Sequence, residues 1–593
     1  MRANPFYGRD GRRAIADEIL AELQATTGCT MVMGLDDVLE AGDARVGSKR
    51  ISGFAERHQL GEWLLPLSAE KGLVWRTAPV PEQTAGKVAF ALSLGFGNGS
   101  PLPQPSGQFD IYVNDRFALA CRVVNHSQLW KGEACALAFA ARRCETAAPY
   151  AALMLSDLIQ NEMQATLGPA LLSVPSDWVQ PGKPATIRVE ARCPVPSTRW
   201  LQIDQVSALL AGTHIDQAAA LLAGERPTAS GYNLYFGDIH THSGQVVDVC
   251  EDNGCGLGTR ESNYAYAEGP GGLDFYCLSD HEWQIDPDDP TKFLGLADTH
   301  NKDGAFVCIP GYEFTNLLWG HRNVYFRDTG GTVINTNRTP GGGPTKDPAL
   351  CIRTETMWEG LEAHGVPFLT VPHHPSATSH PMTWEVFDPR YDRLVEVYSC
   401  WGSSAYYGDF PRGVSDRYSA LCLQKALAKG LRFGMIGSAD GHDGHPGNAQ
   451  SGLVKHHHTF HFCGSGRAVV LTSELTREAV WDALYARRCY ATTGTPIALD
   501  VTLNGAVMGS ERAALAIGDV PRLSVNCVGS NGIDQIRVIK NGRVVYCELG
   551  YGSPTVSFEW QDPSYDRAEP SGYYVRVVQV DHESAWSSPI WLG

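Results

Sequence analysis

The chain has 593 residues, of which 43% are hydrophobic and 19% are charged. These proportions are ordinary for soluble globular proteins and exclude a wholly disordered chain or a fibrous repeat. At roughly 100 to 200 residues per domain, the length predicts about three domains. The 48 Lys and Arg residues against 65 Asp and Glu residues give a net charge of −17, which excludes nonspecific binding to nucleic acids and to anionic membranes.

Cellular location is predicted from what the sequence lacks. No run approaches the ~18 to 20 apolar residues that a membrane-spanning helix needs. The first twenty residues carry several arginines and no apolar core of the kind found in secretory signals. The 16 cysteines are scattered without a CxxC pair, so free thiols are expected even at the closest pair, Cys250 and Cys255. We therefore expect a cytoplasmic protein.

Residues 1–230 are predicted to form a β-rich domain. Short apolar runs separated by a Gly- and Pro-rich stretch are typical of strands, and they lie at 88–94, 109–115, 117–124 and 186–193. Helical patterns interrupt them at 15–25 and 150–160. Neither this region nor the C-terminal one contains a constellation of residues that indicates a chemical activity.

Residues 231–496 show a different rhythm, in which strand-like and helix-like runs alternate. This alternation predicts βα units around a parallel sheet. The expected strands lie at 232–239, 273–280, 305–314, 321–326, 366–372, 393–399 and 432–438. Helices are expected at 355–365 and 417–430, the second stopping at Gly430. Residues 327–348 are rich in Gly and Pro and predict a long loop that sets substrate specificity.

Residues 497–593 are predicted to form a small antiparallel β-sandwich. Strand-like runs lie at 498–503, 522–528, 535–546, 555–560 and 573–580, and Asn541-Gly542 is a hairpin-turn signal. A helix at 476–488 is expected to join this sandwich to the middle domain.

Histidines and carboxylates follow most of the expected strands of the middle domain. His240 and His242 end the first strand with two-residue spacing, so that both imidazoles leave the same face and can bind one ion. Asp248 lies in the following loop. Each of these residues taken alone is as readily a structural or solvated side chain as a metal ligand.

The next two strands end in similar residues. Asp280 and His281 follow the second strand, and either could be a ligand while the other orients it. Glu313 follows the third strand, where a buried carboxylate is costly unless a cation or hydrogen-bond donor meets it, so it is a candidate bridge between two metals.

The remaining strands complete the pattern with His321, His373, His374, Glu396, Asp440 and His442. Imidazoles and carboxylates crowded at one edge of a sheet need positive charge among them, and metal ions supply it. The cluster His456, His457, His458 and His461 is expected to line a loop beside the site.

The motif order HTH, SDH, GYE, a single His, HHP and DGH resembles the polymerase and histidinol phosphatase (PHP) superfamily of metal-dependent phosphoesterases. The motifs cover about residues 232–445, and a looser resemblance extends to 593. The resemblance implies an α/β fold: a distorted (β/α)7 PHP barrel flanked by an N-terminal β-rich domain and a small C-terminal β-sandwich.

The resemblance also implies three groups of metal ligands on the C-terminal rim of the barrel. The first group is His240, His242, Glu313 and Asp440. The second is Glu313, His321 and His374, since His374 directly precedes Pro375 and leaves His373 as a substrate contact. The third is Asp248, His281 and His442; family members often have His where this chain has Asp248. Two or three divalent ions of Zn, Mn or Fe would bind there.

The first functional hypothesis is hydrolysis of a small-molecule phosphate ester by a metal-bridging hydroxide, with no protein nucleophile. Arg322, His373 and His445 are candidate catalytic residues that bind phosphate oxygens or protonate the leaving group. The second hypothesis is hydrolysis of an amide, lactone or carboxyl ester on the same centre, because amidohydrolases share the HxH motif. The third is a binding or regulatory protein whose barrel has lost its activity. The sequence does not indicate the oligomeric state.

Overall fold

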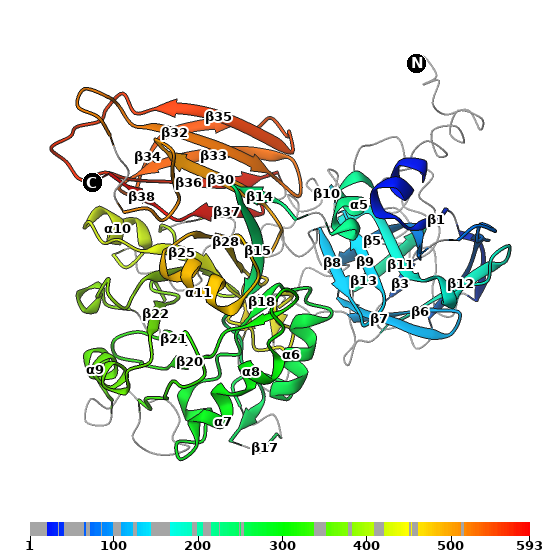
Figure 1. Ribbon diagram of the computed structural model, residues 1–593, viewed down its shortest axis with the longest axis horizontal. Coiled ribbons are helices and arrows are strands. Elements are labelled where there is room, and N and C mark those ends of the chain that lie inside the picture. Colours follow the sequence, from blue (N-terminus) through cyan, green and yellow to red (C-terminus); the bar gives the residue numbers. More distant parts are fainter. Residues whose placement is uncertain are drawn as a thin grey trace. The chain divides into compact units, whose positions relative to one another are not determined.

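The structure is a computed structural model that divides into two compact units, described separately below (Figure 1). The first unit comprises Met1–Glu225 and Gly269–Gly272, and the second comprises Arg226–Glu268 and Leu273–Gly593. The residues that the structure describes are 20–33, 35–40, 64–66, 72–84, 86–98, 108–122, 127–140, 142–143, 166–191, 199–204, 215–224, 226–247, 249–250, 254–336, 351–377, 382–407, 409, 420–449, 452–453, 460–511, 515–580 and 582–592.

The first unit is β-rich and contains two sheets. The eight-stranded sheet consists of β1 (Thr30–Met33), β3 (Leu64–Pro66), β5 (Lys87–Asn98), β8 (Gln128–Lys131), β9 (Ala136–Phe139), β10 (Arg142–Arg143), β11 (Thr166–Pro175) and β13 (Arg199–Asp204). The five-stranded sheet consists of β2 (Leu35–Glu40), β4 (Leu73–Pro79), β6 (Gln108–Val113), β7 (Arg116–Arg122) and β12 (Pro184–Ala191).

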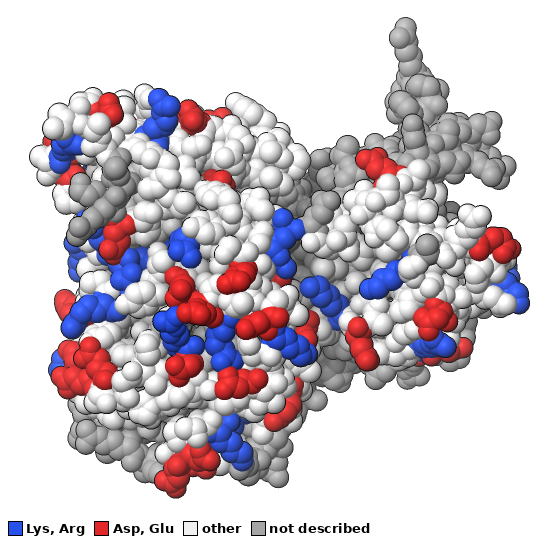
Figure 2. All heavy atoms as spheres, in the orientation of Figure 1, with Lys and Arg blue, Asp and Glu red and all other residues white. Residues whose placement is uncertain are grey.

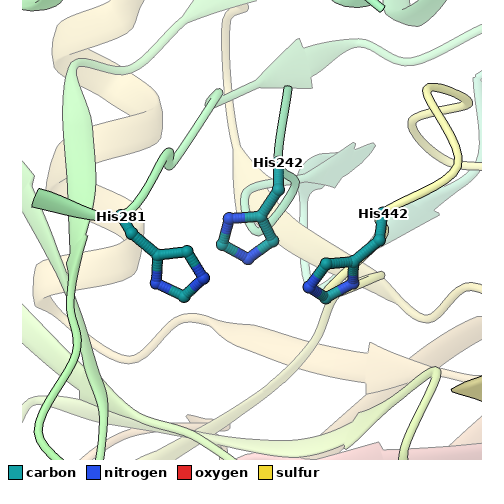
Figure 3. A group of neighbouring side chains, drawn as sticks. All are labelled: His242, His281 and His442. Carbon is teal, nitrogen blue, oxygen red and sulfur yellow. The ribbon is translucent and has the colours of Figure 1, made fainter. Parts of the chain in front are cut away.

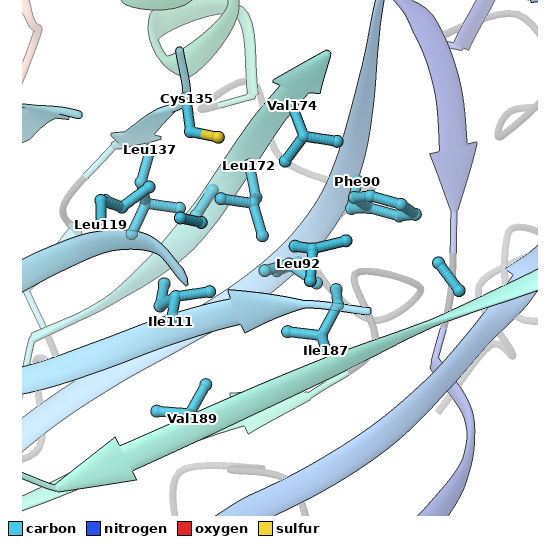
Figure 4. Close-up of a cluster of buried hydrophobic side chains, with 14 of the residues drawn as sticks. Phe90, Leu92, Ile111, Leu119, Cys135, Leu137, Leu172, Val174, Ile187 and Val189 are labelled. Atoms are coloured by element: carbon cyan, nitrogen blue, oxygen red, sulfur yellow. The ribbon is translucent and has the colours of Figure 1, made fainter. Parts of the chain in front are cut away.

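The two sheets pack face to face through apolar side chains. Phe90, Leu92 and Leu172 of the larger sheet belong to one buried cluster with Ile111 and Ile187 of the smaller sheet (Figure 4). Alternation along the strands places every second side chain in this core, which is how period-2 apolar runs form a sandwich.

Two helical segments cover the outer face of the larger sheet. Helix α5 (Ile215–Ala223) and a helix at residues 20–27 contribute Ala218 and Leu23 to a second buried cluster with Leu171 of β11. Leu171 and Leu172 point to opposite faces because they are consecutive in a strand. The helix expected at 150–160 lies outside the described residues.

The second unit is a mixed α/β structure whose largest sheet has eleven strands. They are β14 (Thr228–Ala229), β15 (Tyr232–Asp238), β18 (Phe275–Tyr276), β19 (Val307–Cys308), β28 (Arg467–Thr472), β29 (Cys489–Thr492), β33 (Ile533–Lys540), β34 (Arg543–Leu549), β36 (Gly572–Gln579), β37 (Ser584–Ser587) and β38 (Ile590–Trp591). Strands β15, β18 and β19 run parallel, as expected for βα units, whereas β28 pairs with β15 antiparallel.

Two three-stranded sheets contain the other expected strands of the middle region. The first holds β20 (Gly311–Phe314), β21 (Arg322–Phe326) and β22 (Phe368–Pro372). The second holds β23 (Leu394–Ser399), β24 (Gly402–Ser403) and β25 (Gly434–Gly437), with β23 and β25 parallel. Short two-stranded ladders are β16 (Gln245–Val246) with β17 (Val249–Cys250), and β26 (Gly452–Leu453) with β27 (Phe460–His461). Among the described strands, no single sheet closes into a barrel.

Strand β21 departs from the expected parallel arrangement. It pairs antiparallel with both β20 and β22. Only residues 315–321 separate β20 from β21, and a parallel crossover needs a dozen or more residues. Because the strand is reversed, residues at its start lie at the same edge as residues that follow the parallel strands.

Six helices accompany these sheets within the described part of the second unit. They are α6 (Arg260–Glu268), α7 (Pro290–Leu294), α8 (Leu296–His300), α9 (Thr354–His364), α10 (Leu423–Ala428) and α11 (Arg477–Tyr485). Helix α9 ends at Gly365, whose φ of 87° forms a left-handed cap that glycine tolerates best. Helix α11 begins after Thr476, whose hydroxyl accepts a hydrogen bond from the Ala479 N–H at 3.2 Å.

The C-terminal region forms a sandwich that shares one layer with the middle region. A four-stranded sheet of β30 (Ala498–Leu503), β31 (Ala506–Val507), β32 (Arg522–Val528) and β35 (Thr555–Gln561) is one layer. Its Leu499 and Val525 belong to the same buried cluster as Val538 of β33 and Leu234 of β15. The second layer is thus the eleven-stranded sheet, and the domain boundaries at 230/231 and 496/497 stay predictions.

Surface features agree with the composition. On the face shown in Figure 2, acidic and basic side chains are interspersed rather than gathered by sign. No helix within the described ranges combines the length and apolar character needed to cross a membrane. Cys255 is a free thiol, as are the other cysteines whose side chains the structure describes.

Candidate metal centre

Buried histidines and carboxylates meet at one edge of the strands in the second unit. Each is positioned by the end or start of a strand or by the loop after it. His240 and His242 follow β15, His281 follows β18, Glu313 lies in β20, His321 precedes β21, His373 and His374 follow β22, and Asp440 and His442 follow β25. All of these side chains are buried. The structure therefore places eight of the predicted ligands close to one another and to His373.

Glu313 lies at the centre of this arrangement. Its two carboxylate oxygens face different histidines. Oε2 lies 3.3 Å from His240 Nε2, 3.2 Å from His242 Nε2 and 3.3 Å from His281 Nδ1, and Oε1 lies 2.7 Å from His321 Nδ1 and 3.2 Å from His373 Nε2. One carboxylate thus joins two sets of imidazoles.

Asp440 is the second carboxylate of the cluster. Its Oδ1 lies 3.3 Å from His242 Nε2 and 3.4 Å from His240 Nε2, and its Oδ2 lies 3.8 Å from His374 Nε2. The backbone of Asp440 has a φ of 48° and that of His374 a φ of 29°. Left-handed conformations of residues other than glycine are strained and often occur at functional sites.

The spacing of these donor atoms fits metal ligands. Metal–nitrogen and metal–oxygen bonds of about 2.0 to 2.2 Å with tetrahedral angles place two ligand atoms roughly 3.4 Å apart. The contacts of Glu313 Oε2 and Asp440 Oδ1 with His240 and His242 lie at 3.2 to 3.4 Å. Among the described residues, the buried Nδ1 atoms of His242, His373 and His442 have no hydrogen-bond partner. The donor set and its geometry fit bound cations.

Among the residues that the structure describes, four groups of donors could hold an ion, each with its ligand atoms within 4.8 Å of one another. They are His240, His242, Glu313 and Asp440; His321, His373 and His374; His242, His281 and His442; and Cys400, His442 and His461. The first group is the set that the resemblance implied. The second contains His373 as well as His374, so both remain candidate ligands. The third contains His242 and lacks Asp248, which lies outside the described residues. Figure 3 shows the imidazoles of this third group converging.

Carboxylates behind the cluster hold its histidines in place. His240 Nδ1 lies 3.0 Å from Oε2 of the buried Glu396 on β23. A ligating histidine commonly donates its second N–H to a carboxylate in this way, which fixes the tautomer and leaves Nε2 free to bind a metal. Asp280 turns away from the cluster and accepts hydrogen bonds from the Ser243 N–H at 2.7 Å and from Arg260 Nε at 2.9 Å. It thereby supports the loop after His242.

Asp238 links the loop that carries His240 to the loop that carries Asp440. Its carboxylate accepts hydrogen bonds from the backbone N–H groups of Ala439 at 2.9 Å and Gly447 at 2.8 Å. Because Asp238 ends β15 and Ala439 follows β25, the clamp fixes His240 relative to Asp440. Burial raises the pKa of Asp238 to about 6, although the backbone donors oppose this shift.

The electrostatics of the cluster favour two charged carboxylates and hold several of the imidazoles neutral. Burial disfavours the ionised form of Glu313, but neighbouring His281 and His373 outweigh it and hold the pKa of Glu313 well below its usual range. Burial together with the nearby His242 lowers the pKa of His442 to about 3. Burial and His240 lower the pKa of His373 to about 4. Neutral imidazoles offer the lone pairs that metal binding requires.

The pKa values of His240 and His242, the two histidines nearest the carboxylates, are raised instead. Burial opposes the charged form of His242, but contacts with Asp440 and Glu313 raise its pKa to about 9. Glu396 titrates at a pKa of about 7, because burial disfavours its charge more strongly than His240 stabilises it. The carboxylates beside His240 and His242 therefore favour positive charge at these two imidazoles, which bound protons or a metal cation would supply.

Two predicted catalytic residues lie apart from the cluster. The Arg322 side chain is fully buried and pairs with Asp392, with Nε 3.2 Å from Oδ1 and Nη2 3.3 Å from Oδ2. Alternation along β21 explains this, because Arg322 points to the face opposite that of its neighbours. His445 stacks edge-on against Tyr266 with ring centroids 4.7 Å apart and lies 3.7 Å from Asp443. Neither belongs to a donor group.

Sequence reasoning did not assign roles to Cys400 and His461. The Cys400 thiol donates to the backbone oxygen of Asp440 at 3.0 Å, and His461 Nε2 accepts from the His442 N–H at 3.2 Å. His461 sits beside the site, as expected of its loop, whereas His456, His457 and His458 lie outside the described residues. Cys400 follows β23 by one residue, and that position is the signal that could have identified it.

Comparisons with known proteins give little functional information. Residues 419–506 match a family described as a protein of unknown function, DUF3604. An uncharacterized protein of Chlamydia pneumoniae is 28% identical over 386 residues, which cover 61% of this chain and 57% of the relative. An uncharacterized protein of Chlamydia trachomatis is 29% identical over 393 residues, covering 61% and 57%. The chain thus spans less than two thirds of the length of these relatives.

Two solved structures show weak likeness. One is a two-domain protein from Bacteroides vulgatus containing a predicted PHP-like metal-dependent phosphoesterase, with a TM-score of 0.30 and 14% identity over 62% of this chain and 97% of that one. The other is PsfC from Pseudomonas syringae, with a TM-score of 0.24 and 18% identity over 40% of this chain and 82% of that one. Likenesses of this size carry no argument about function.

Proposed function

We propose that the protein is a metal-dependent hydrolase of the PHP type that cleaves a phosphate ester of a small molecule. The observation that carries the proposal is the position of Glu313, whose two oxygens face separate sets of buried imidazoles. A carboxylate in this position can bridge two ions. The sequence motifs HTH, SDH, GYE, HHP and DGH support the same conclusion, because their histidines and acids supply the donor groups.

The residues of the chain would hold two or three ions of Zn, Mn or Fe. Mixed imidazole and carboxylate donors suit these metals. Such ions lower the pKa of a bound water and stabilise the attacking and leaving oxygens of an in-line displacement. Glu396 would hold His240 in its ligating tautomer, and Asp238 would fix the spacing between the ligand loops. His373 would bind an ion or contact the substrate.

The strand order supports a distorted (β/α)7 barrel as the scaffold. Strands β15, β18, β20, β21, β22, β23 and β25 follow one another through pairings or isolated parallel bridges. Bridges join His281 to Glu313 and Thr370 to Asp392, and a bridge from Thr241 to Gly441 returns to the first strand. The reversed β21 and the lack of a continuous ladder are the distortion. We also propose the domain boundaries 230/231 and 496/497 and a cytoplasmic location.

Hydrolysis of a carboxyl ester, lactone or amide is a second candidate. A specific observation favours it: the guanidinium of Arg322, expected to bind phosphate, pairs instead with Asp392. A neutral substrate would not require that cation, whereas a phosphate ester would depend on the ions to offset the charge of an acidic protein. The two candidates differ in the charge that the substrate brings to the site.

Chromogenic substrates distinguish these candidates. The metal-loaded protein is assayed with p-nitrophenyl phosphate, bis-p-nitrophenyl phosphate and p-nitrophenyl acetate. We expect faster turnover of a phosphate ester, competitive inhibition by inorganic phosphate, and loss of turnover in Asp440→Asn. Asp288→Asn, at an exposed loop position, is the matched control. Turnover of the acetate alone, with no inhibition by phosphate, would replace the first function by the second.

A further inference from the structure

A cavity of about 190 Å³ lies apart from the donor groups. It is found where the eleven-stranded sheet meets α10 and the residues before that helix. Tyr406 and Gln424 line it from that segment, and Arg537, Arg576 and Trp586 line it from β33, β36 and β37. None of its lining residues is a member of a candidate metal group.

Two arginines are direct partners across the strands that floor this cavity. Arg537 of β33 lies opposite Arg576 of β36 in the antiparallel ladder. Like charges in this relationship destabilise a sheet unless a counter-charge lies between them. Asp409 supplies one, since its Oδ1 lies 2.8 Å from Arg576 Nη1. In the described part of the chain, the Arg537 side chain donates hydrogen bonds to Gln535 and Tyr406 and forms no ion pair with a carboxylate.

Two residues that line the cavity carry buried hydrogen-bond donors that lack acceptors among the described residues. Arg576 Nε and Trp586 Nε1 are buried and have no hydrogen-bond partner among the described residues. The Tyr406 hydroxyl accepts from Arg576 Nη1 at 2.8 Å and so retains its own proton for a further acceptor. Donors buried without acceptors are costly, and most native structures satisfy them. An acceptor-rich group that reached these donors from the cavity would satisfy them.

The chemistry of these walls defines the ligand. Guanidinium groups bind planar or tetrahedral oxyanions through charge-assisted hydrogen bonds. Ile539, Val544 and Tyr574 add apolar surface to the same cavity. We propose that this cavity is a binding site for a small organic anion, whose carboxylate or phosphate contacts Arg537, Arg576 and Trp586 and whose apolar part packs on the remaining wall.

Calorimetric titration of the metal-loaded protein with benzoate, and separately with inorganic phosphate, tests this site. We expect saturable binding of at least one of these anions, weakened about tenfold or more by Arg537→Gln and by Trp586→Phe. Trp586→Phe keeps the aromatic ring that stacks on Tyr398 and removes only the indole donor. Arg543→Gln removes an exposed charge from neighbouring β34 and is the matched control, expected to leave binding unchanged.

The outcomes separate cleanly. Binding of benzoate alone assigns a carboxylate ligand, and binding of phosphate alone assigns a phosphate ligand. If the anions bound at the metal centre instead, Arg537→Gln and Trp586→Phe would leave their affinity unchanged. That result would overturn the proposal. So would equal binding of neutral benzamide and benzoate, or no binding of either anion at millimolar concentrations.

Discussion

His240 Nδ1 lies 3.0 Å from Oε2 of Glu396, a carboxylate buried on β23. The contact joins residues 156 positions apart and leaves His240 Nε2 directed at Glu313 and Asp440. The role of this contact can be tested by a substitution that removes the negative charge of Glu396 and keeps the shape of its side chain.

We predict that Glu396→Gln lowers metal affinity by about 10- to 100-fold, because carboxylate partners of ligating histidines contribute that much. Competition with a chromogenic chelator measures the affinity. Glu359→Gln, at an exposed position of helix α9, is the control and should bind metal like the wild type. Unchanged affinity in Glu396→Gln would show that Glu396 does not orient a ligand.

Removal of metal should lower thermal stability. A ligand present at about 100 to 1,000 times its dissociation constant stabilises the folded state by roughly 2.7 to 4.1 kcal/mol. We therefore expect the melting temperature to fall after treatment with a chelator and to recover when metal is returned. His240→Ala, which lacks a ligand of one group only, should show a smaller fall in melting temperature with chelator than the wild type. An equal response of wild type and His240→Ala would place the stabilising metal elsewhere.

Arg322→Ala should destabilise the fold. It would leave Asp392 buried without its ion-pair partner, and breaking a buried pair typically costs about 3 to 5 kcal/mol. Denaturant unfolding measures the change. Arg390→Ala, which removes a pair at an exposed site, should have little effect. If Arg322→Ala kept full stability and lost only turnover of phosphate esters, the residue would be a substrate contact after all.

The positions of the candidate ligands could be predicted from the sequence because most of them follow a short apolar strand. The HxH and DGH spacings determine which side chains share a face, and that is local information. The partner of Arg322 could not be predicted, because Asp392 is 70 residues away and the reversal of β21 depends on the short connection of residues 315–321. The pairing of Arg537 with Arg576 likewise depends on a register between distant strands.

The C-terminal region illustrates the same limit. Its strands and the Asn541-Gly542 turn are visible in the sequence, but period-2 alternation does not say which sheet a strand joins. The structure pairs β29 with β37, which makes one sheet from residues on both sides of position 496.

A fragment of residues 226–496 should therefore fail to fold. It would lose β37, one of the two partners of β29, and expose Leu234 and Val469, which belong to one buried cluster with Val538 and Val575. Solubility on expression, followed by proton NMR of any soluble material, tests this. A chain of residues 226–593 is the control and should fold with the eleven-stranded sheet complete. A well-folded 226–496 fragment would contradict the shared core and support an independent sandwich.

The most direct test of the account is elemental analysis of the purified protein and of Glu313→Gln after expression with supplemented metal. Glu313 is the carboxylate common to both sets of imidazoles, so its substitution should affect both. We predict at least two transition-metal ions per chain in the wild type and a loss of at least one ion in Glu313→Gln, with the circular dichroism spectrum retained. Fewer than one ion per wild-type chain, or the same metal content in Glu313→Gln, would contradict a bridged metal centre.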